Sequence, residues 1–335
     1  MKRNIIIKNY KSILNLIDTE KTIKLVKDTF ERKLAEELGL IRVSAPLFVE
    51  PQTGLNDNLN GYEKAVSFKS IELNQELEVV QSLAKWKRNA LKMYDFEANT
   101  GLYTDMNAIR PFEELDNIHS LYVDQWDWEK IITEQERTYD FLKETVEKIY
   151  EALLATEKVL IEAYPILSHN LPKEIKFIST SELEAKYPDL SRKERENAIA
   201  KEYKAVFIHQ IGWPLKDGKP HDGRAADYDD WHLNGDILLW YEPLEIGLEV
   251  SSMGIRVNKQ SLVKQLEYKN ENHKLNFDYH QDILNDVLPL TIGGGIGQSR
   301  MCMYMLKKAH IGEVQSSTWS KEDIQLFKEN NIHLL

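Results

Sequence analysis

Two acidic residues stand in apolar segments that are predicted to form neighbouring strands. Asp236 is followed by Ile-Leu-Leu-Trp, and Glu249 lies between Leu248 and Val250. Carboxylates are rarely buried in a strand without a partner. Two carboxylates that face one pocket suit a hard cation that bridges polyphosphate oxygens. A salt bridge to a core-facing arginine is the alternative, and the spacing leaves both interpretations open.

Three basic residues are candidate partners for phosphate or carboxylate groups: Lys87, Arg110 and Arg256. Arg110 precedes a proline and therefore ends an extended stretch, and Arg256 lies seven residues beyond Glu249. A guanidinium group grips either kind of anion through two hydrogen bonds. Because further basic residues flank Lys87, a solvated basic helix face is the alternative interpretation of that segment.

The segment from Ile292 to Arg300 reads Ile-Gly-Gly-Gly-Ile-Gly-Gln-Ser-Arg and is predicted to be a glycine-rich turn. It is not a P-loop, because no Gly-Lys-Ser/Thr ends it, and its glycine spacing does not fit the dinucleotide fingerprint. Glycines let the backbone approach a ligand closely. An arginine in the first turn of the following helix can meet a phosphate at the helix N-terminus. A turn that only packs a helix closely on a sheet is the alternative.

An amide and a carboxylate share one face of a predicted strand. Residues 120–129 alternate in polarity, so Gln125 and Asp127 point to the same side. Such a pair can hold the polar head of an amino acid, with Asp127 taking the ammonium group. His119 precedes this strand and either meets a phosphate or closes a loop, whereas the acidic segment around Asp229 is either functional or merely solvated.

Composition limits the classes of function. The net charge of −11 argues against a broad nucleic-acid-binding face. The single cysteine, Cys302, lies in an apolar run and is expected to be a core residue rather than a nucleophile. The apolar runs are shorter than the roughly 20 residues of a membrane span, and no signal peptide is recognisable. We therefore expect a cytoplasmic enzyme, and no linker or repeat divides the single domain predicted for residues 1–335.

The predicted elements must position these side chains. Apolar periodicity predicts helices over 22–38, 83–93, 133–164, 260–268, 279–287 and 298–307, with further capped helical turns at Ser181 and Ser191. Strands are predicted over 65–68, 77–80, 120–129, 175–179, 205–211, 235–241 and 246–251. Because the strands come in adjacent pairs rather than alternating strictly with helices, we expect an α+β fold with a largely antiparallel mixed sheet flanked by helices.

Eight short motifs together resemble one family, the ammonia-dependent aspartate–ammonia ligases (asparagine synthetase A). They occur in the family's order along nearly the whole chain, at 57–59, 81–88, 109–111, 123–129, 227–231, 233–236, 249–256 and 293–300. The resemblance implies the catalytic-domain fold of the class II aminoacyl-tRNA synthetases and a homodimer formed through helix 22–38 and the strand before Pro46. Two departures are Ala84, where tRNA synthetases for aspartate carry glutamine, and a shortened stretch between Trp231 and Asn234.

The resemblance also implies roles for individual residues. The ATP site would comprise Arg110 on the α-phosphate and Arg300 on the γ-phosphate, with His119, Val123 and Gly295, and Asp236 and Glu249 would hold Mg²⁺. The aspartate site would comprise Ser82, Lys87, Gln125, Asp127, Ser252 and Arg256. Asp57 or Asp229 would bind or deprotonate ammonium. Which aspartate carboxylate Lys87 and Arg256 grip stays open.

The implied reaction activates the β-carboxylate of aspartate with Mg-ATP and transfers it to ammonia. L-Asparagine, AMP and pyrophosphate are the products, and no nucleic acid or membrane takes part. Free ammonia is expected rather than glutamine, because glutamine hydrolysis needs a nucleophilic thiolate. One alternative is an aspartyl- or asparaginyl-tRNA synthetase, although the short segment before Thr22 leaves no room for an anticodon-reading domain. The other is a non-catalytic sensor of aspartate or adenylate.

Overall fold

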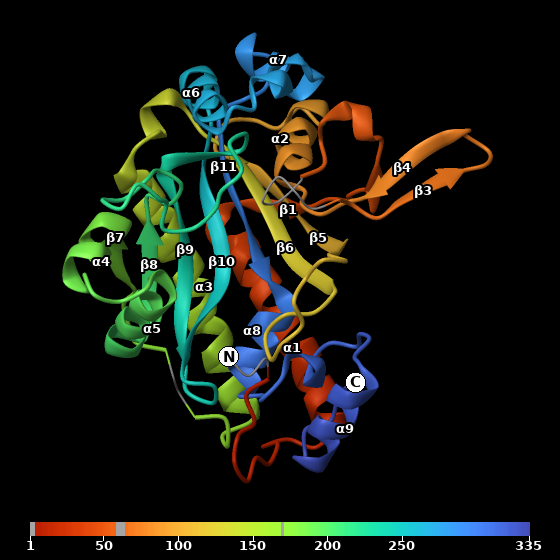
Figure 1. Cartoon of the computed structure of the whole chain (residues 1–335), viewed down its shortest axis with the longest axis vertical. Helices are drawn as coiled ribbons and strands as arrows, with labels where there is room; N and C mark the ends of the chain where they lie inside the picture. Colours follow the sequence, from red (N-terminus) through yellow and green to blue (C-terminus); the bar gives the residue numbers. More distant parts are fainter. Residues whose placement is uncertain (1–3, 58–63, 169–170) are drawn as a thin grey trace.

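A computed structural model describes residues 4–57, 64–168 and 171–335 of the chain. Within these residues a central sheet of eight strands has the order β1-β5-β6-β11-β10-β9-β8-β7 (Figure 1). The strands are β1 (Leu40–Arg42), β5 (Gly101–Ile109), β6 (Tyr122–Ile131), β11 (Thr291–Gly297), β10 (Ile246–Arg256), β9 (Asp229–Tyr241), β8 (Ala205–His209) and β7 (Lys176–Ser179). The two outermost pairs are parallel and the inner pairs are antiparallel. The expected mixed, largely antiparallel sheet is confirmed.

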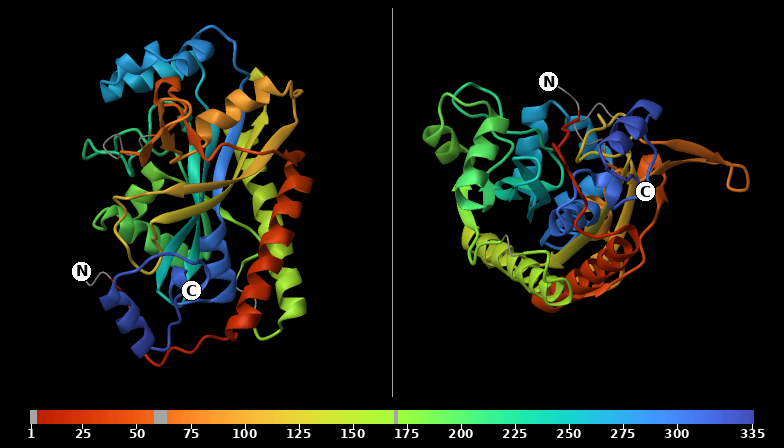
Figure 2. Two further views of the ribbon diagram at one scale, coloured as in Figure 1. Left: turned by 90° about the vertical axis from the view of Figure 1, so that its right-hand side faces the viewer. Right: turned by 90° about the horizontal axis from the view of Figure 1, so that it is seen from below.

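Two long helices lie side by side across one face of this sheet (Figure 2). They are α1 (Leu16–Leu38) and α3 (Tyr139–Ala163). Helix α1 begins upstream of its predicted start, because the Asn15 side chain accepts a hydrogen bond from the Asp18 amide, and it ends at Gly39 in the left-handed conformation. Its apolar stripe packs on β6, where the ring centroids of Phe30 and Trp126 are 4.7 Å apart. This packing forms the main core and leaves the opposite face for the site.

Shorter elements surround that opposite face. A small sheet of β2 (Phe48–Val49), β4 (Gln75–Val79) and β3 (Ser67–Ser70) carries a hairpin that projects from the body of the molecule (Figure 1). The other helices are α2 (Ala84–Met93), α4 (Thr180–Lys186), α5 (Arg192–Tyr203), α6 (Lys259–Lys269), α7 (Asp278–Leu284), α8 (Gln298–Leu306) and α9 (Lys321–Glu329). Short 3-10 helices span Pro51–Thr53, Glu134–Glu136, Asn272–Asn276 and Ile311–Glu313. No helix of the described chain is long and apolar enough to cross a membrane.

The glycine-rich segment is the main correction to the predicted elements. It is not a turn but β11, a strand inside the central sheet. Its glycines are needed for close approach, because a Cβ on Gly293 would lie 1.9 Å from the Glu129 carboxylate and one on Gly294 would lie 2.5 Å from Met253. On the face of Gly293 and Gly295, the missing side chains leave room for the polar and charged groups of the neighbouring strands.

Two further differences concern local signals. Strand β5 was not predicted, because its mixed sequence shows no clean alternation over 101–109. The helical turn predicted to be capped at Ser181 is capped at Ser179, which exchanges hydrogen bonds with Glu182. The cap predicted at Ser191 is confirmed, with Glu194 as its reciprocal partner.

Candidate active site

A polar cavity opens on the face of the sheet that α1 and α3 leave free. Its lining includes 14 of the 15 predicted site residues: Asp57, Ser82, Lys87, Arg110, His119, Val123, Gln125, Asp127, Asp229, Glu249, Ser252, Arg256, Gly295 and Arg300. The remaining one, Asp236, forms an ion pair with Arg224, which itself lines the cavity. The structure therefore brings together side chains from nearly the whole length of the chain.

One row of residues runs across four strands, and its first three members line the floor of the cavity. Asp127 of β6 pairs with Gly295 of β11, Gly295 pairs with Ser252 of β10, and Ser252 pairs with Asp236 of β9. Cross-strand partners project from the same face of a sheet, so these four positions share one surface. Gln125 lies two residues before Asp127 and points to the same side. The register thus places an amide, two carboxylates and a hydroxyl along one line.

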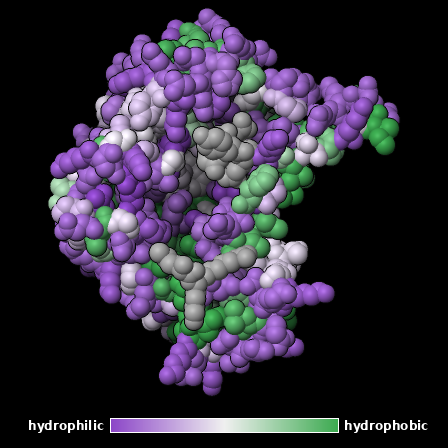
Figure 3. Space-filling view, viewed as in Figure 1, coloured by the Kyte–Doolittle hydropathy of each residue, from purple (hydrophilic) through white to green (hydrophobic). Residues whose placement is uncertain are grey.

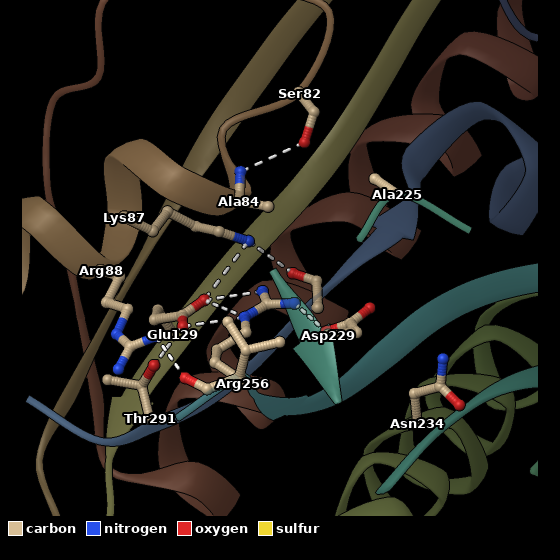
Figure 4. A network of polar contacts seen from close by, with 12 residues as sticks. Ser82, Ala84, Lys87, Arg88, Glu129, Ala225, Asp229, Asn234, Arg256 and Thr291 are labelled. Atoms are coloured by element: carbon tan, nitrogen blue, oxygen red, sulfur yellow. Dashed lines mark hydrogen bonds and ion pairs between the residues drawn. The ribbon is translucent and has the colours of Figure 1, made fainter. Parts of the chain in front are cut away.

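A buried cluster of charges lies beside this row (Figure 4). Lys87 of α2 forms an ion pair with Asp127 and donates to the Gly294 carbonyl at 2.9 Å. Arg256 donates from Nη2 to Glu129 Oε2 at 2.7 Å and also pairs with Asp229. Lys87 and Glu129 are fully buried, and Arg256 is 2% exposed.

These two cations and three carboxylates leave a formal excess of one negative charge. Burial would raise the pKa of Glu129, but Arg256 holds that pKa below its ordinary value. Burial raises the pKa of Asp229 despite the neighbouring Arg256. Burial likewise lowers the pKa of Lys87, and Asp127 opposes that shift. A cluster with excess negative charge is suited to receive one more cationic group, such as an ammonium.

The second pair of acids lies at the other end of the row. Asp236 forms an ion pair with Arg224, while its Oδ1 atom is buried without a hydrogen-bond partner among the described residues. Burial raises the pKa of Asp236 to about 7, with Arg224 opposing and Glu249 adding to the rise. Among the described residues no group of three acidic, histidine or cysteine side chains is placed to hold a metal ion. A cation held by Asp236 and Glu249 would therefore need phosphate oxygens or water as its other ligands.

Three basic side chains face the cavity beyond these acids. Arg110 follows β5, and its guanidinium lies 4.0 Å from Glu113. His119 Nδ1 lies 2.9 Å from Asp116. Arg300 sits in the first turn of α8 and donates from Nη1 to the Glu249 carbonyl at 3.1 Å. Arginines from two separate elements thus face one space, as binding of a polyphosphate requires.

Among the residues not predicted as site residues, Asp124 and Arg224 line the cavity, and Glu129 belongs to the buried charge cluster beside it. Glu129 continues the face of Gln125 and Asp127, so strand periodicity could have identified it. Asp124 accepts from the Ser299 amide at 3.0 Å and pairs with Lys27 at 3.1 Å, which fixes the start of α8. Arg224 lies in a loop without periodicity, so no sequence signal marked it.

Comparison with known proteins agrees with this geometry. A family model described as aspartate-ammonia ligase matches residues 17–331. An aspartate–ammonia ligase of Bacillus cytotoxicus is 59% identical over 325 residues, covering 97% of this chain and 99% of that protein. One of Bacillus cereus is 57% identical with the same coverage.

Solved structures support the fold. The asparaginyl-tRNA synthetase of Pyrococcus horikoshii, complexed with asparaginyl-adenylate, aligns with a TM-score of 0.66 at 16% identity, covering 89% of this chain and 68% of that chain. The asparaginyl-tRNA synthetase of Entamoeba histolytica, also in complex with asparaginyl-adenylate, aligns with a TM-score of 0.65 at 13% identity, covering 90% of this chain and 66% of that chain. Such distant likeness shows the class II synthetase fold alone, whereas the two Bacillus relatives align with 97% of this chain at 57–59% identity. The chain belongs to the aspartate–ammonia ligase family.

Proposed function

We propose that this protein makes L-asparagine from L-aspartate and ammonia, with ATP activating the β-carboxylate as an adenylate and AMP and pyrophosphate leaving. The observation that supports this most is the continuous row from Asp127 to Asp236. It joins a charge cluster suited to an amino acid to an acidic pair and arginines suited to a nucleotide. The two substrates would therefore meet on one rigid strand face, as a reaction controlled by positioning requires.

The nucleotide would lie over β11 and the start of α8. Arg110 would neutralise the α-phosphate, and Arg300 the γ-phosphate, with His119 and Val123 beside them. Gly295 carries no side chain, which keeps the approach to the strand open. Asp236 and Glu249 fit Mg²⁺ as hard oxygen donors, and a bound ion would supply neutralisation of phosphate charge.

Aspartate would occupy the end of the row at the charge cluster. Asp127 and Gln125 would receive its α-ammonium group, which fits the excess negative charge there. Lys87 and Arg256 would present positive charge to one carboxylate, supported by Ser82 and Ser252. The β-carboxylate must face the α-phosphorus, where one of its oxygens displaces pyrophosphate.

Ammonia would then attack the activated carbonyl, and AMP would leave with the carboxylate oxygen. Ammonium must first lose a proton, and Asp57 or Asp229 would bind or accept it. Asp229 is a stronger base than an exposed aspartate because burial raises its pKa. Replacing each by Asn should raise the ammonia KM or stop the second step; unchanged asparagine formation in both variants would exclude this role.

The overall activity is tested by incubating the protein with ATP, Mg²⁺, aspartate and either ammonium or glutamine. We expect asparagine with ammonium, in equal amount to AMP, and none with glutamine. Charging of tRNA with aspartate or asparagine in a parallel assay would favour the synthetase alternative. Binding of aspartate and ATP without turnover would favour the sensor.

We also propose that the chain works as a single catalytic domain and as a homodimer in the cytoplasm. Large apolar side chains are exposed on β1 and the projecting hairpin, including Ile41 at 60% and Ile71 at 94%. Figure 3 shows the hairpin tip as a hydrophobic patch on a mostly hydrophilic face. Exposed apolar patches are typical of protein interfaces. Light scattering after size exclusion should give twice the monomer mass.

A further inference from the structure

Arg224 occupies an unexpected place beside the acidic pair of Asp236 and Glu249. It lies in the loop between β8 and β9, yet its side chain is only 11% exposed. One guanidinium nitrogen, Nη2, pairs with Asp236. The other, Nη1, donates to Asp222 Oδ2 at 2.7 Å and to the Gly223 carbonyl at 2.9 Å. A loop arginine is thus inserted at the acidic pair of Asp236 and Glu249.

The charges at this position decide what Arg224 can do there. Asp236, Glu249 and Asp222 all act electrostatically on Arg224, and together they raise its pKa above the ordinary value, although burial opposes the rise. Without a metal ion, the buried Asp236 beside the half-buried Glu249 needs such a cation, because an unpaired buried charge is costly. A divalent cation bound to Asp236 and Glu249 would compete with the guanidinium for the same oxygens and would repel it.

The triphosphate provides a new partner for a displaced guanidinium. Arg224, Arg110 and Arg300 all line the same cavity, and arginine binds phosphate through charge-assisted, often paired hydrogen bonds. The loop that carries Arg224 contains Gly212 and Gly218 in positive-φ conformations, at 129° and 79°. Such positions are suited to a change of loop path. A short movement could therefore transfer the guanidinium from carboxylate to phosphate.

We propose that Arg224 is an exchangeable internal cation: it neutralises the Asp236–Glu249 pair in the nucleotide-free enzyme and moves onto the triphosphate when a divalent cation enters with ATP. This inference rests on the proposed role of Asp236 and Glu249 in holding that cation. It gives the loop a defined function, because metal and nucleotide then bind together rather than separately. Free divalent cations would be excluded from the empty site.

The experiment measures binding of Mn²⁺ and of the non-cleavable analogue α,β-methylene-ATP to the protein by equilibrium dialysis, each alone and both together. For Arg224→Gln we expect Mn²⁺ alone to bind about tenfold more tightly or better, and the analogue about tenfold more weakly, as expected for a charge-assisted contact. Arg224→Lys retains the positive charge, so its affinity for Mn²⁺ alone should stay near that of the wild-type protein. It also keeps the test informative if Arg224→Gln folds poorly.

Arg192→Gln is the matched control, because Arg192 anchors the same loop through two hydrogen bonds to Asp217, both at 2.8 Å, away from the cavity. Arg192→Gln should leave the affinities for Mn²⁺ and for the analogue within about twofold of the wild-type values, as expected for an exposed ion pair. The inference is overturned if Arg224→Gln leaves Mn²⁺ binding unchanged, or if Arg192→Gln produces the same shifts.

A third variant separates this inference from the proposed function. Asp236→Asn should weaken binding of Mn²⁺ in the presence of the analogue. If it does so while Arg224→Gln has no effect, only the role of Arg224 is wrong. If Asp236→Asn binds Mn²⁺ as wild type does, the assignment of the acidic pair itself is wrong, and the inference falls with it.

Discussion

The glycines of β11 allow a graded test of how the site is built. Gly293, Gly295 and Gly297 alternate along one face of the strand, each facing a different neighbour. A Cβ on Gly295 would lie 2.5 Å from Gln125 Oε1 and 3.4 Å from Asp127 Oδ1. Carbon–oxygen contacts normally lie at about 3.3–3.6 Å, so Gly295→Ala would force the Gln125 amide to retreat by about 1 Å. The perturbation therefore acts on the site and little on the core.

The expected magnitude follows from that displacement. Misplacing a positioning group by about 1 Å can cost on the order of 10²-fold in rate. Since the end of a glutamine side chain can move, the fold should lose only about 1–3 kcal/mol from overpacking. Steady-state kinetics with aspartate and ammonium, together with urea unfolding, separate the two effects. We expect kcat/KM to fall about 10²-fold with a small loss of stability.

The two neighbouring glycines serve as controls, because one substitution should cost much folding stability and the other very little. Gly293→Ala would place a methyl group 1.9 Å from Glu129 Oε2 and 2.7 Å from Arg256 Nη2. Breaking this buried ion pair should cost about 3–5 kcal/mol of folding stability. In Gly297→Ala the three nearest described atoms all belong to the Arg300 side chain, at 3.4–3.8 Å, and stability should change by about 0.5 kcal/mol or less. Full activity of Gly295→Ala, or equal losses in all three variants, would refute the reasoning.

Three further predictions concern other parts of the molecule. Arg256 holds the pKa of Glu129 below its ordinary value against the effect of burial, so the stability lost in Glu129→Gln should be constant above about pH 5 and shrink only below it. Urea unfolding of both proteins at several pH values measures this loss. A loss of stability that grows on acidification would contradict the prediction. Burial raises the pKa of Cys302 to about 12, so iodoacetamide should not alkylate the native protein but should react after unfolding, and rapid native labelling seen by mass spectrometry would disprove the core assignment. Ile41→Lys should shift the protein toward monomer in light scattering, because a buried unpaired charge opposes association; an unchanged mass would exclude β1 from the interface.

The sequence alone was sufficient to place a side chain where the regular alternation of a strand determines the face to which that side chain points. Alternation along 120–129 placed Gln125 and Asp127 on one face, and the structure puts both in the cavity. Asp236 and Glu249 were predicted on neighbouring strands, and β9 and β10 pair directly. These predictions succeeded because strand geometry is local and side chains alternate strictly.

Other features depend on contacts distant in sequence. The glycine segment was predicted to be a turn, because glycine lowers strand propensity, yet Glu129 and Met253 from neighbouring strands make side chains impossible there. Arg224 reaches Asp236 from a loop, and Arg256 joins Glu129 across a separation of 127 residues. No local pattern encodes such pairs, since they arise only when the sheet order brings the strands together.

The central claim, adenylation of the β-carboxylate, is tested most directly with aspartate carrying ¹⁸O only in that carboxylate. The reaction with ATP and ammonium should transfer one labelled oxygen to AMP, because that oxygen joins the α-phosphorus and stays there when ammonia displaces AMP. Labelled inorganic phosphate together with ADP would contradict the account, since it would mean attack at the γ-phosphorus. Unlabelled AMP would contradict it equally, because activation would then have used the α-carboxylate.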